Sequence, residues 1–238
     1  MKQSSAKLKM TAREILTGRW TTAVAVTCIL SLVAAGALYL SWLFLSSMRR
    51  SAFMVFSSIA VILIVSLLLL LFEAGVAYFF LKLGRTRDSK VSDLLYAFKA
   101  CPDRILINGF LLTGVLVIYG IPYYIAFSRV TGSAFFSVVF LSVWGVIGTV
   151  LLIFILLEFS QFIFILLDDP DCGAIESLKK SARLMKGNKW RLFKVVFSFI
   201  GWFFLDLLSG GLGALWIRPY YTETLSLFYR SLKDEVTE

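Results

Sequence analysis

The chain has 238 residues, of which 59% are hydrophobic and only 16% are charged, and its formal net charge is +9. Ordinary soluble domains are about 45–50% apolar and about 25% charged, so this composition excludes a soluble enzyme, a disordered chain and a nucleic-acid-binding module. The sequence contains no histidine, the commonest general base and metal ligand. We therefore expect an integral membrane protein whose excess basic residues set its orientation and contact anionic lipid.

Six apolar segments follow the basic residues 1–19. About 20 residues suffice for a helix to cross a bilayer, which predicts an all-α, polytopic protein with about six transmembrane helices in three hairpins. The predicted spans are 20–48, 51–81, 105–128, 130–167, 190–208 and 212–229. A cleaved signal peptide is the alternative for the first span, because Ala35 and Ala37 form an A-x-A pattern, but the apolar run continues past that point. The last pair is the least regular, since Lys194, Asp206 and Arg218 interrupt it.

The basic residues predict the orientation of these spans. With the N-terminus inside, the inner segments hold 19 of the 24 lysines and arginines, and the outer loops hold three: Arg49, Arg50 and Arg129. This bias is a strong positive-inside signal and places both termini in the cytoplasm. The three cysteines form no CxxC pair, so we expect reduced, structural thiols rather than disulfides or a zinc site.

A short helix is predicted before each hairpin, because apolar residues recur at helical spacing. The three apolar stripes are Val91, Leu94, Leu95 and Phe98; Ile175, Leu178, Ala182 and Met185; and, more weakly, Leu8, Ala12, Ile15 and Leu16. We expect each helix to lie in the membrane interface with this stripe towards the lipid. The basic residues beside the second stripe are the predicted contacts with anionic phospholipid headgroups: Lys179, Lys180, Arg183 and Lys186.

One glutamate recurs in the second span of each hairpin, at Glu73, Glu158 and Glu223. Together with the recurring basic helix, this pattern predicts a single membrane domain, 1–238, built from three repeated units, 1–84, 85–168 and 169–238. Counting residues from the inner boundary places each carboxylate near the bilayer midplane. The three glutamates are therefore either a shared intramembrane polar site for protons or cations, or three hydrogen-bonding groups that fix helix packing.

Two further acidic positions are interpreted as structural. Asp168, Asp169 and Asp171 end the fourth span and need counter-charges, for which Lys179 and Lys180 are the candidates and a divalent ion is the alternative, although their spacing matches no metal motif. Asp206 and Arg218 flank the turn at Gly210 and are expected to pair near the outer face. We predict no catalytic residues, metal site or cofactor.

Two segments resemble a known family. They are Ser181-Ala182-Arg183-Leu184-Met185-Lys186-Gly187-Asn188-Lys189-Trp190-Arg191-Leu192-Phe193 with the later Trp216, Pro219-Tyr220 and Phe228-Tyr229-Arg230, and the N-terminal Ala12-Arg13 with Gly18-Arg19-Trp20. Both are similar to the bacterial membrane family called domain of unknown function 975. The resemblance implies a multi-spanning protein of the bacterial cytoplasmic membrane and supplies no catalytic residues.

Two functional hypotheses follow from these features. The first is a non-catalytic, lipid-interacting scaffold, or an accessory subunit of an envelope or transport system, whose partners are the bilayer and its anionic headgroups. The alternative is a transporter or channel that uses the three glutamates as a proton or cation relay. A membrane enzyme acting on lipid has less support, because no residue is placed to activate a nucleophile.

Overall fold

The computed structural model describes residues 4–46, 52–128 and 134–237, and these residues are helical with no strand among them. Four segments are long and apolar enough to cross a membrane: Trp20–Phe44, Ala60–Thr86, Pro102–Tyr123 and Val139–Asp168. They fall on the first four predicted spans, so the chain is a helical membrane protein. The predicted outer arginines, Arg49, Arg50 and Arg129, lie outside the described residues.

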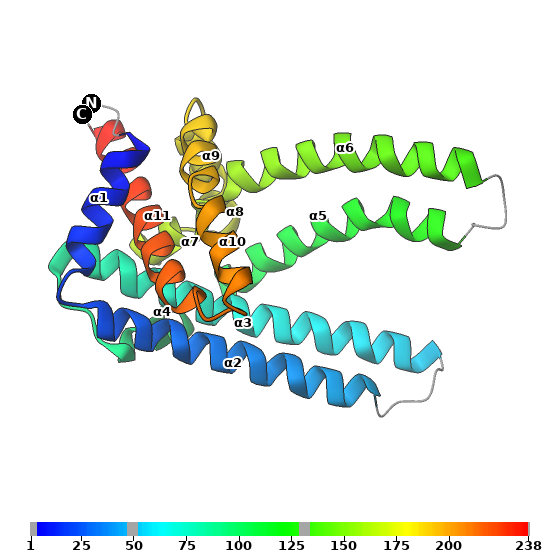
Figure 1. Ribbon diagram of the computed structural model, residues 1–238, viewed down its shortest axis with the longest axis horizontal. Helices are drawn as coiled ribbons and strands as arrows, with labels where there is room; N and C mark the ends of the chain where they lie inside the picture. The colour runs from blue at the N-terminus through cyan, green and yellow to red at the C-terminus, as the bar shows by residue number, and fades with distance from the viewer. Residues whose placement is uncertain (1–3, 47–51, 129–133, 238) are drawn as a thin grey trace.

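The four long helices form two pairs that extend in the same direction (Figure 1). One pair is α2 (Trp20–Ser46) and α3 (Ala52–Thr86), and the other is α5 (Pro102–Ser128) and α6 (Ala134–Phe159). Large apolar side chains along them are exposed, including Leu32, Ile62, Val117 and Val146. Exposed apolar side chains in such number mark a surface that lipid covers in a membrane protein.

The shorter elements gather at one end of the two pairs, and we call this assembly the head (Figure 1). It contains α1 (Ser5–Leu16), the 3-10 helix η1 (Val91–Leu95), α4 (Tyr96–Ala100), α7 (Phe162–Asp168), α8 (Ala174–Met185), α9 (Lys189–Phe197), α10 (Ile200–Leu208) and α11 (Ala214–Thr237). Two buried clusters form its core, one around Phe79, Phe199 and Phe228 and the other around Leu81, Ile105 and Leu166. The tightly packed part of the protein therefore lies at this end.

The apolar stripe of α1 packs against protein. Ser4 caps the helix by accepting a hydrogen bond from the Lys7 amide at 3.3 Å. All four stripe residues are buried in the first core cluster, beside Leu227 and Leu232 of α11: Leu8, Ala12, Ile15 and Leu16. The sequence predicts this helix and its apolar side correctly, but the head covers the stripe that we expected to face lipid.

The links that follow α1 and α8 have the same conformation. Gly18 and Gly187 both take the left-handed conformation, with φ of +82° and +80°, which glycine adopts without steric cost. The residue before each glycine, Thr17 or Lys186, has an extended backbone, and the residue before that, Leu16 or Met185, is fully buried. The two links thus form one kind of turn at the start of a new helix.

The fifth and sixth predicted spans form a folded-back hairpin. The segment 190–208 is broken at Ser198 into α9 and α10, of nine residues each, and neither is long enough to cross a bilayer alone. Lys9 of α1 stabilises the break, since its ammonium donates to the Ser198 carbonyl at 2.8 Å and lies 4.1 Å from the centre of the Phe199 ring.

The turn of this hairpin stops well short of the far end of the long helices. Thr27 lies only seven residues into α2, and its hydroxyl is 3.5 Å from the Leu215 carbonyl at the start of α11. Beyond Thr27, α2 continues for about 28 Å to Ser46 at 1.5 Å per residue. The described residues therefore contain four candidate spans and one hairpin whose two ends, at Lys189 and Thr237, both lie in the head.

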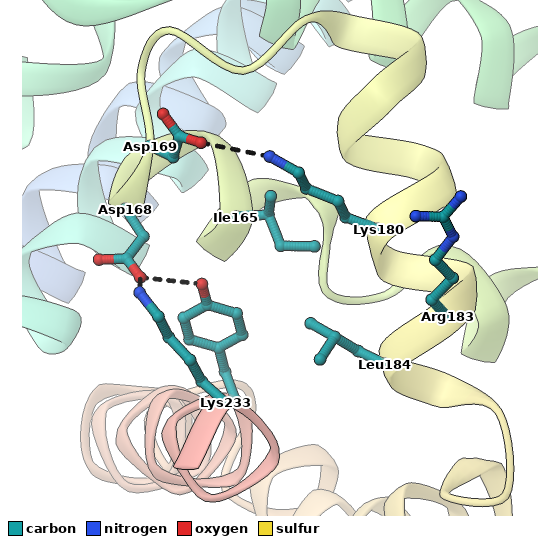
Figure 2. A pocket seen from close by; sticks show the side chains of 8 residues that line it. Ile165, Asp168, Asp169, Lys180, Arg183, Leu184 and Lys233 are labelled. Carbon is teal, nitrogen blue, oxygen red and sulfur yellow. Dashed lines mark hydrogen bonds and ion pairs between the residues drawn. The ribbon is translucent and has the colours of Figure 1, made fainter. Parts of the chain in front are cut away.

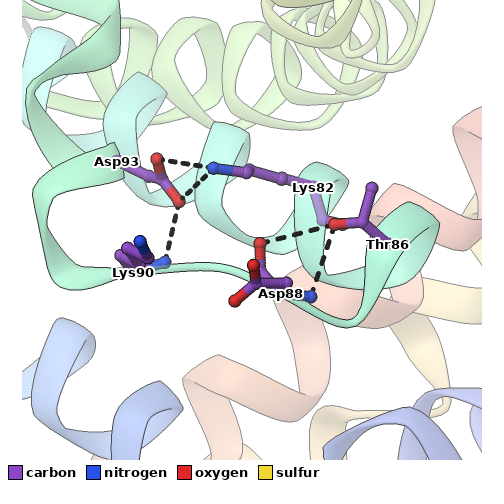
Figure 3. A network of polar contacts seen from close by, with 5 residues as sticks. All are labelled: Lys82, Thr86, Asp88, Lys90 and Asp93. Carbon is purple, nitrogen blue, oxygen red and sulfur yellow. Dashed lines mark hydrogen bonds and ion pairs between the residues drawn. The ribbon is translucent and has the colours of Figure 1, made fainter.

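The link between α3 and α5 folds back along α3. Asp93 of η1 bridges Lys82 at 2.9 Å and accepts a hydrogen bond from the Lys90 amide at 2.8 Å, while Thr86 binds both backbone groups of Asp88 (Figure 3). About one helical turn before Lys82 on α3, the ring of Tyr78 stacks on that of Tyr96 with centres 3.6 Å apart. In the apolar stripe that begins at Val91, Leu94 is buried, whereas Val91 and Leu95 are exposed.

Candidate functional site

The predicted headgroup-binding helix, α8, is attached to the long helices by serines. Asn108 of α5 donates to the Ser177 hydroxyl at 2.8 Å. The Ser181 hydroxyl donates to the Glu158 carbonyl at 2.8 Å and accepts from the Gln161 amide at 3.2 Å, which satisfies two backbone groups at the break between α6 and α7. These serines therefore act as packing groups that fix which side of α8 faces outward.

Three of the four predicted headgroup residues lie on the outward side of α8. Lys179, Arg183 and Lys186 are exposed, and among the described residues the structure gives none of them an ion pair. Lys180 differs, because its ammonium lies 3.1 Å from Glu176 and 3.3 Å from Asp169. The hydrogen bond that the Lys180 ammonium donates to Glu176 is the main reason that the pKa of Lys180 is raised above its usual value.

The apolar stripe of α8 is only partly covered by protein. Met185 is fully buried, Leu178 and Ala182 are half-buried, and Ile175 is exposed. The exposed Ile175 and the three exposed bases thus occur on one helix whose other side is fixed to the membrane helices. This combination is typical of a segment at a lipid surface.

Asp168 joins the ends of α3, α7 and α11 beside a cavity of about 340 Å³ (Figure 2). Its carboxylate lies 2.6 Å from Arg85 of α3 and 2.5 Å from Lys233 of α11, and it accepts a hydrogen bond from Tyr229 at 3.0 Å. The cationic neighbours expected for Asp168 were Lys179 and Lys180, but Lys180 reaches only Asp169. Partners from distant helices take that role because α3, α7 and α11 all end in this region.

Two of the three recurring glutamates are ion-paired to the folded-back hairpin. Glu73 of α3 lies 2.6 Å from Arg218 of α11, and Glu158 of α6 lies 3.0 Å from Lys189 of α9. Arg218 was expected to pair with Asp206, and that interpretation is wrong. The Asp206 carboxylate instead accepts the Ala214 amide at 2.7 Å and closes the turn at the start of α11.

The third glutamate, Glu223, is completely buried, and neither of its carboxylate oxygens has a hydrogen-bond partner among the described residues. It lies against Gly84 of α3, where Arg230 donates to the Gly84 carbonyl at 2.6 Å. Burial raises the pKa of this carboxyl, which is outside the four candidate spans, and Arg230 only partly opposes that shift.

Glu73 and Glu223 do not meet, because Glu223 lies against Gly84, which is eleven residues or about 16 Å from Glu73 along α3. Within the described part of the chain, no three acidic or cysteine side chains come close enough to hold a metal ion. Glu158 is also the last residue but one of α6, because the helix breaks at Ser160 and Gln161 instead of continuing to Asp168. The residue count that predicted a common depth assumed unbroken helices.

A family model described as "Protein of unknown function (DUF975)" matches residues 1–236. The chain belongs to this family. No curated protein and no solved structure matches the chain. The family carries no established activity, so it assigns no role to any residue described above.

The sequence signature of this DUF975 protein lies in the hairpin and the helix before it. Arg191 makes two hydrogen bonds to Glu235, both 3.0 Å long, and so ties α9 to the end of α11. Tyr220 packs edge-to-face on Phe199 at the break between α9 and α10. These signature residues hold the head together, and their contacts identify no reacting group.

Proposed function

We propose that this protein is a non-catalytic component of the bacterial cytoplasmic membrane that binds anionic phospholipid headgroups through α8. In this role it serves as a scaffold or as an accessory subunit of an envelope or transport system. The observation that carries the proposal is the exposed row formed by Lys179, Arg183 and Lys186, for which the described residues offer no carboxylate partner. An exposed basic row at a membrane surface attracts anionic lipid.

The orientation of the chain supports this role. The inner segments carry 19 of the 24 basic residues, and the helices that carry them lie in the head. Leu8 near the start and Leu232 near the end of the chain share one core cluster, so both ends belong to the same side of the protein. We propose that the head, with both termini, lies on the cytoplasmic side, where the negative leaflet faces it.

The matching turns at Gly18 and Gly187 support a proposal of internal repetition. Each follows a helix of twelve residues and precedes the start of a new helix, α2 or α9, and both glycines have the same left-handed φ. We propose that the first and third units derive from one repeated element, with the third shortened into the folded-back hairpin. The link before α5 contains no such glycine, since Cys101 alone separates α4 from α5.

The lipid-binding role can be tested on the full chain with Lys179, Arg183 and Lys186 all changed to glutamine. Each base contributes about 1 kcal/mol near an anionic surface, so the triple variant should lose up to about 3 kcal/mol of affinity for anionic lipid. Native mass spectrometry after mild detergent extraction measures the bound lipid classes. The control variant carries Lys179→Arg, Arg183→Lys and Lys186→Arg, which keep the positive charge at all three positions.

Unchanged retention of anionic lipid in the glutamine variant would refute the role of α8. Loss of anionic lipid in the charge-preserving control as well would mean that the substitutions act by disturbing the head. The alternative role in transport predicts instead that solute flux into proteoliposomes depends on the recurring glutamates. Two of these already have cationic partners, which favours packing as their role.

A further inference from the structure

We infer that the groove between α6 and α9 holds one acyl chain of an anionic phospholipid, with the lipid phosphate at Lys189 and Lys194. The groove has a volume of about 400 Å³. Its walls are apolar: Val150, Ile153, Phe154 and Leu157 on α6, and Trp190 and Phe193 on α9. This inference rests on the proposed lipid-binding function but places a second, separate contact away from α8.

The position of the groove determines the kind of ligand. Its α6 wall belongs to the candidate span Val139–Asp168, so the groove opens towards the hydrocarbon of the bilayer. From Val150 to Leu157 the wall is about 10 Å long at 1.5 Å per residue, which fits within the roughly 15 Å depth of one leaflet. An acyl chain is the apolar ligand that the bilayer itself presents at this depth.

The charges at the head end of the groove determine the headgroup. The Lys189 ammonium lies 3.0 Å from Glu158 and 5.5 Å from the centre of the Phe154 ring. A lysine ammonium has three donors, so this ion pair leaves it able to bind a further acceptor. The Lys194 ammonium lies 5.7 Å from the centre of the Trp190 ring. Two ammonium groups beside one apolar groove are complementary to a phosphate attached to an acyl chain.

The aromatic face of α9 fits an interfacial site. Trp190 and Phe193 stack with centres 5.0 Å apart, and Trp190 is 62% exposed. Tryptophan is enriched where the headgroups meet the hydrocarbon. A transmembrane helix of a partner protein would also cover the apolar walls, but it would gain nothing from the two lysines.

The test uses the full chain in nanodiscs that contain a phosphatidylglycerol with a photoreactive diazirine in its acyl chain. Labelled peptides are mapped by mass spectrometry. The expected result is labelling of α6 at Val150 to Leu157 and of α9 at Trp190 to Phe193, and competition by unlabelled phosphatidylglycerol. Val150→Trp fills the groove and should abolish this labelling. Val146→Trp, on the same helix but outside the groove, should leave it unchanged.

A second variant tests the headgroup. Lys194→Gln should lower the preference for phosphatidylglycerol over phosphatidylcholine about fivefold, the effect of one base near an anionic surface. Equal labelling of every exposed face of α6, or labelling that survives Val150→Trp, would overturn the inference. Recovery of a cross-linked protein in place of lipid would do the same. Groove labelling that persists in the α8 glutamine variant would show that the groove binds lipid independently of Lys179, Arg183 and Lys186. The groove site and the α8 headgroup site can therefore be refuted separately.

Discussion

Replacing Gly75 with alanine should push η1 away from α3. A Cβ atom at Gly75 would lie 1.9 Å from the Leu94 carbonyl oxygen and 2.8 Å from its carbonyl carbon, whereas real Cβ contacts essentially never fall under 3.0 Å. The backbone at Leu94 must therefore move by more than 1 Å. Such movement is resisted, because Asp93 beside it is held by both Lys82 and the Lys90 amide.

The size of the effect follows from two opposing terms. Forcing extra atoms into a packed site costs about 1–3 kcal/mol, and alanine gains about 1 kcal/mol over glycine in a helix. The clash dominates, and we expect a net loss of up to about 2 kcal/mol. For a chain of this size, each 1 kcal/mol lowers the midpoint of thermal unfolding by about 2–4 °C.

Thermal unfolding in detergent measures this loss, with Gly114→Ala as the matched control. Gly114 is also a helical glycine in a candidate span, but a Cβ there would meet nothing within 4 Å. We expect the control to be neutral or slightly stabilising. Tyrosine fluorescence gives a second readout, since displacement of η1 and α4 separates the stacked Tyr78 and Tyr96. Equal stability of the two variants would refute the close packing of η1 on α3.

Three further predictions concern the hairpin α9–α11. Leu208 is 83% exposed near the turn, and in a variant lacking the native cysteines a single cysteine at this position should not react with membrane-impermeant maleimide added from either side. Labelling from outside would show that the hairpin crosses the membrane. Because the pKa of Glu223 is raised on folding, the folded state binds its proton more tightly, and stability should fall as pH rises above about 4.5 towards that raised pKa. Glu223→Gln should abolish this slope in thermal unfolding, and a slope that persists would assign it to another group. A double-mutant cycle in which Arg191 and Glu235 are each changed to alanine should give a coupling free energy of about 1 kcal/mol for this partly exposed ion pair. Losses of unfolding free energy that simply add in the double variant would contradict this.

The parts of the fold that the sequence predicts well are those controlled by local composition. Four uncharged runs longer than 20 residues can satisfy their backbone groups in lipid only as helices, and all four are found. The helix of Ser5–Leu16 and that of Ala174–Met185 follow from apolar spacing alone. Periodicity does not say whether lipid or protein covers the apolar side, which is why the stripe beginning at Leu8 was placed wrongly.

The break between α9 and α10 has no local signal. No proline occurs in residues 189–208, the one glycine there, Gly201, lies inside α10, and the segment is apolar enough to suggest one continuous span. The lysine that satisfies the Ser198 carbonyl lies 189 residues earlier in the chain. The same holds for the partner of Glu73, since Arg218 is 145 residues away. Only the assembled head brings these groups together, so spacing within one segment does not reveal them.

The placement of the glutamates indicates how the head is fixed to the long helices. The basic neighbours of Glu73, Glu158 and Glu223 are Arg218, Lys189 and Arg230, and all three bases belong to the hairpin α9–α11. A carboxylate next to lipid is costly unless it is neutralised, so each long pair needs the hairpin to supply a charge. These ion pairs also hold the hairpin in place at two points, because Lys189 joins α9 to α6 and Arg218 joins α11 to α3. Charge pairing thus explains how a hairpin that contains no candidate span stays docked on the four long helices.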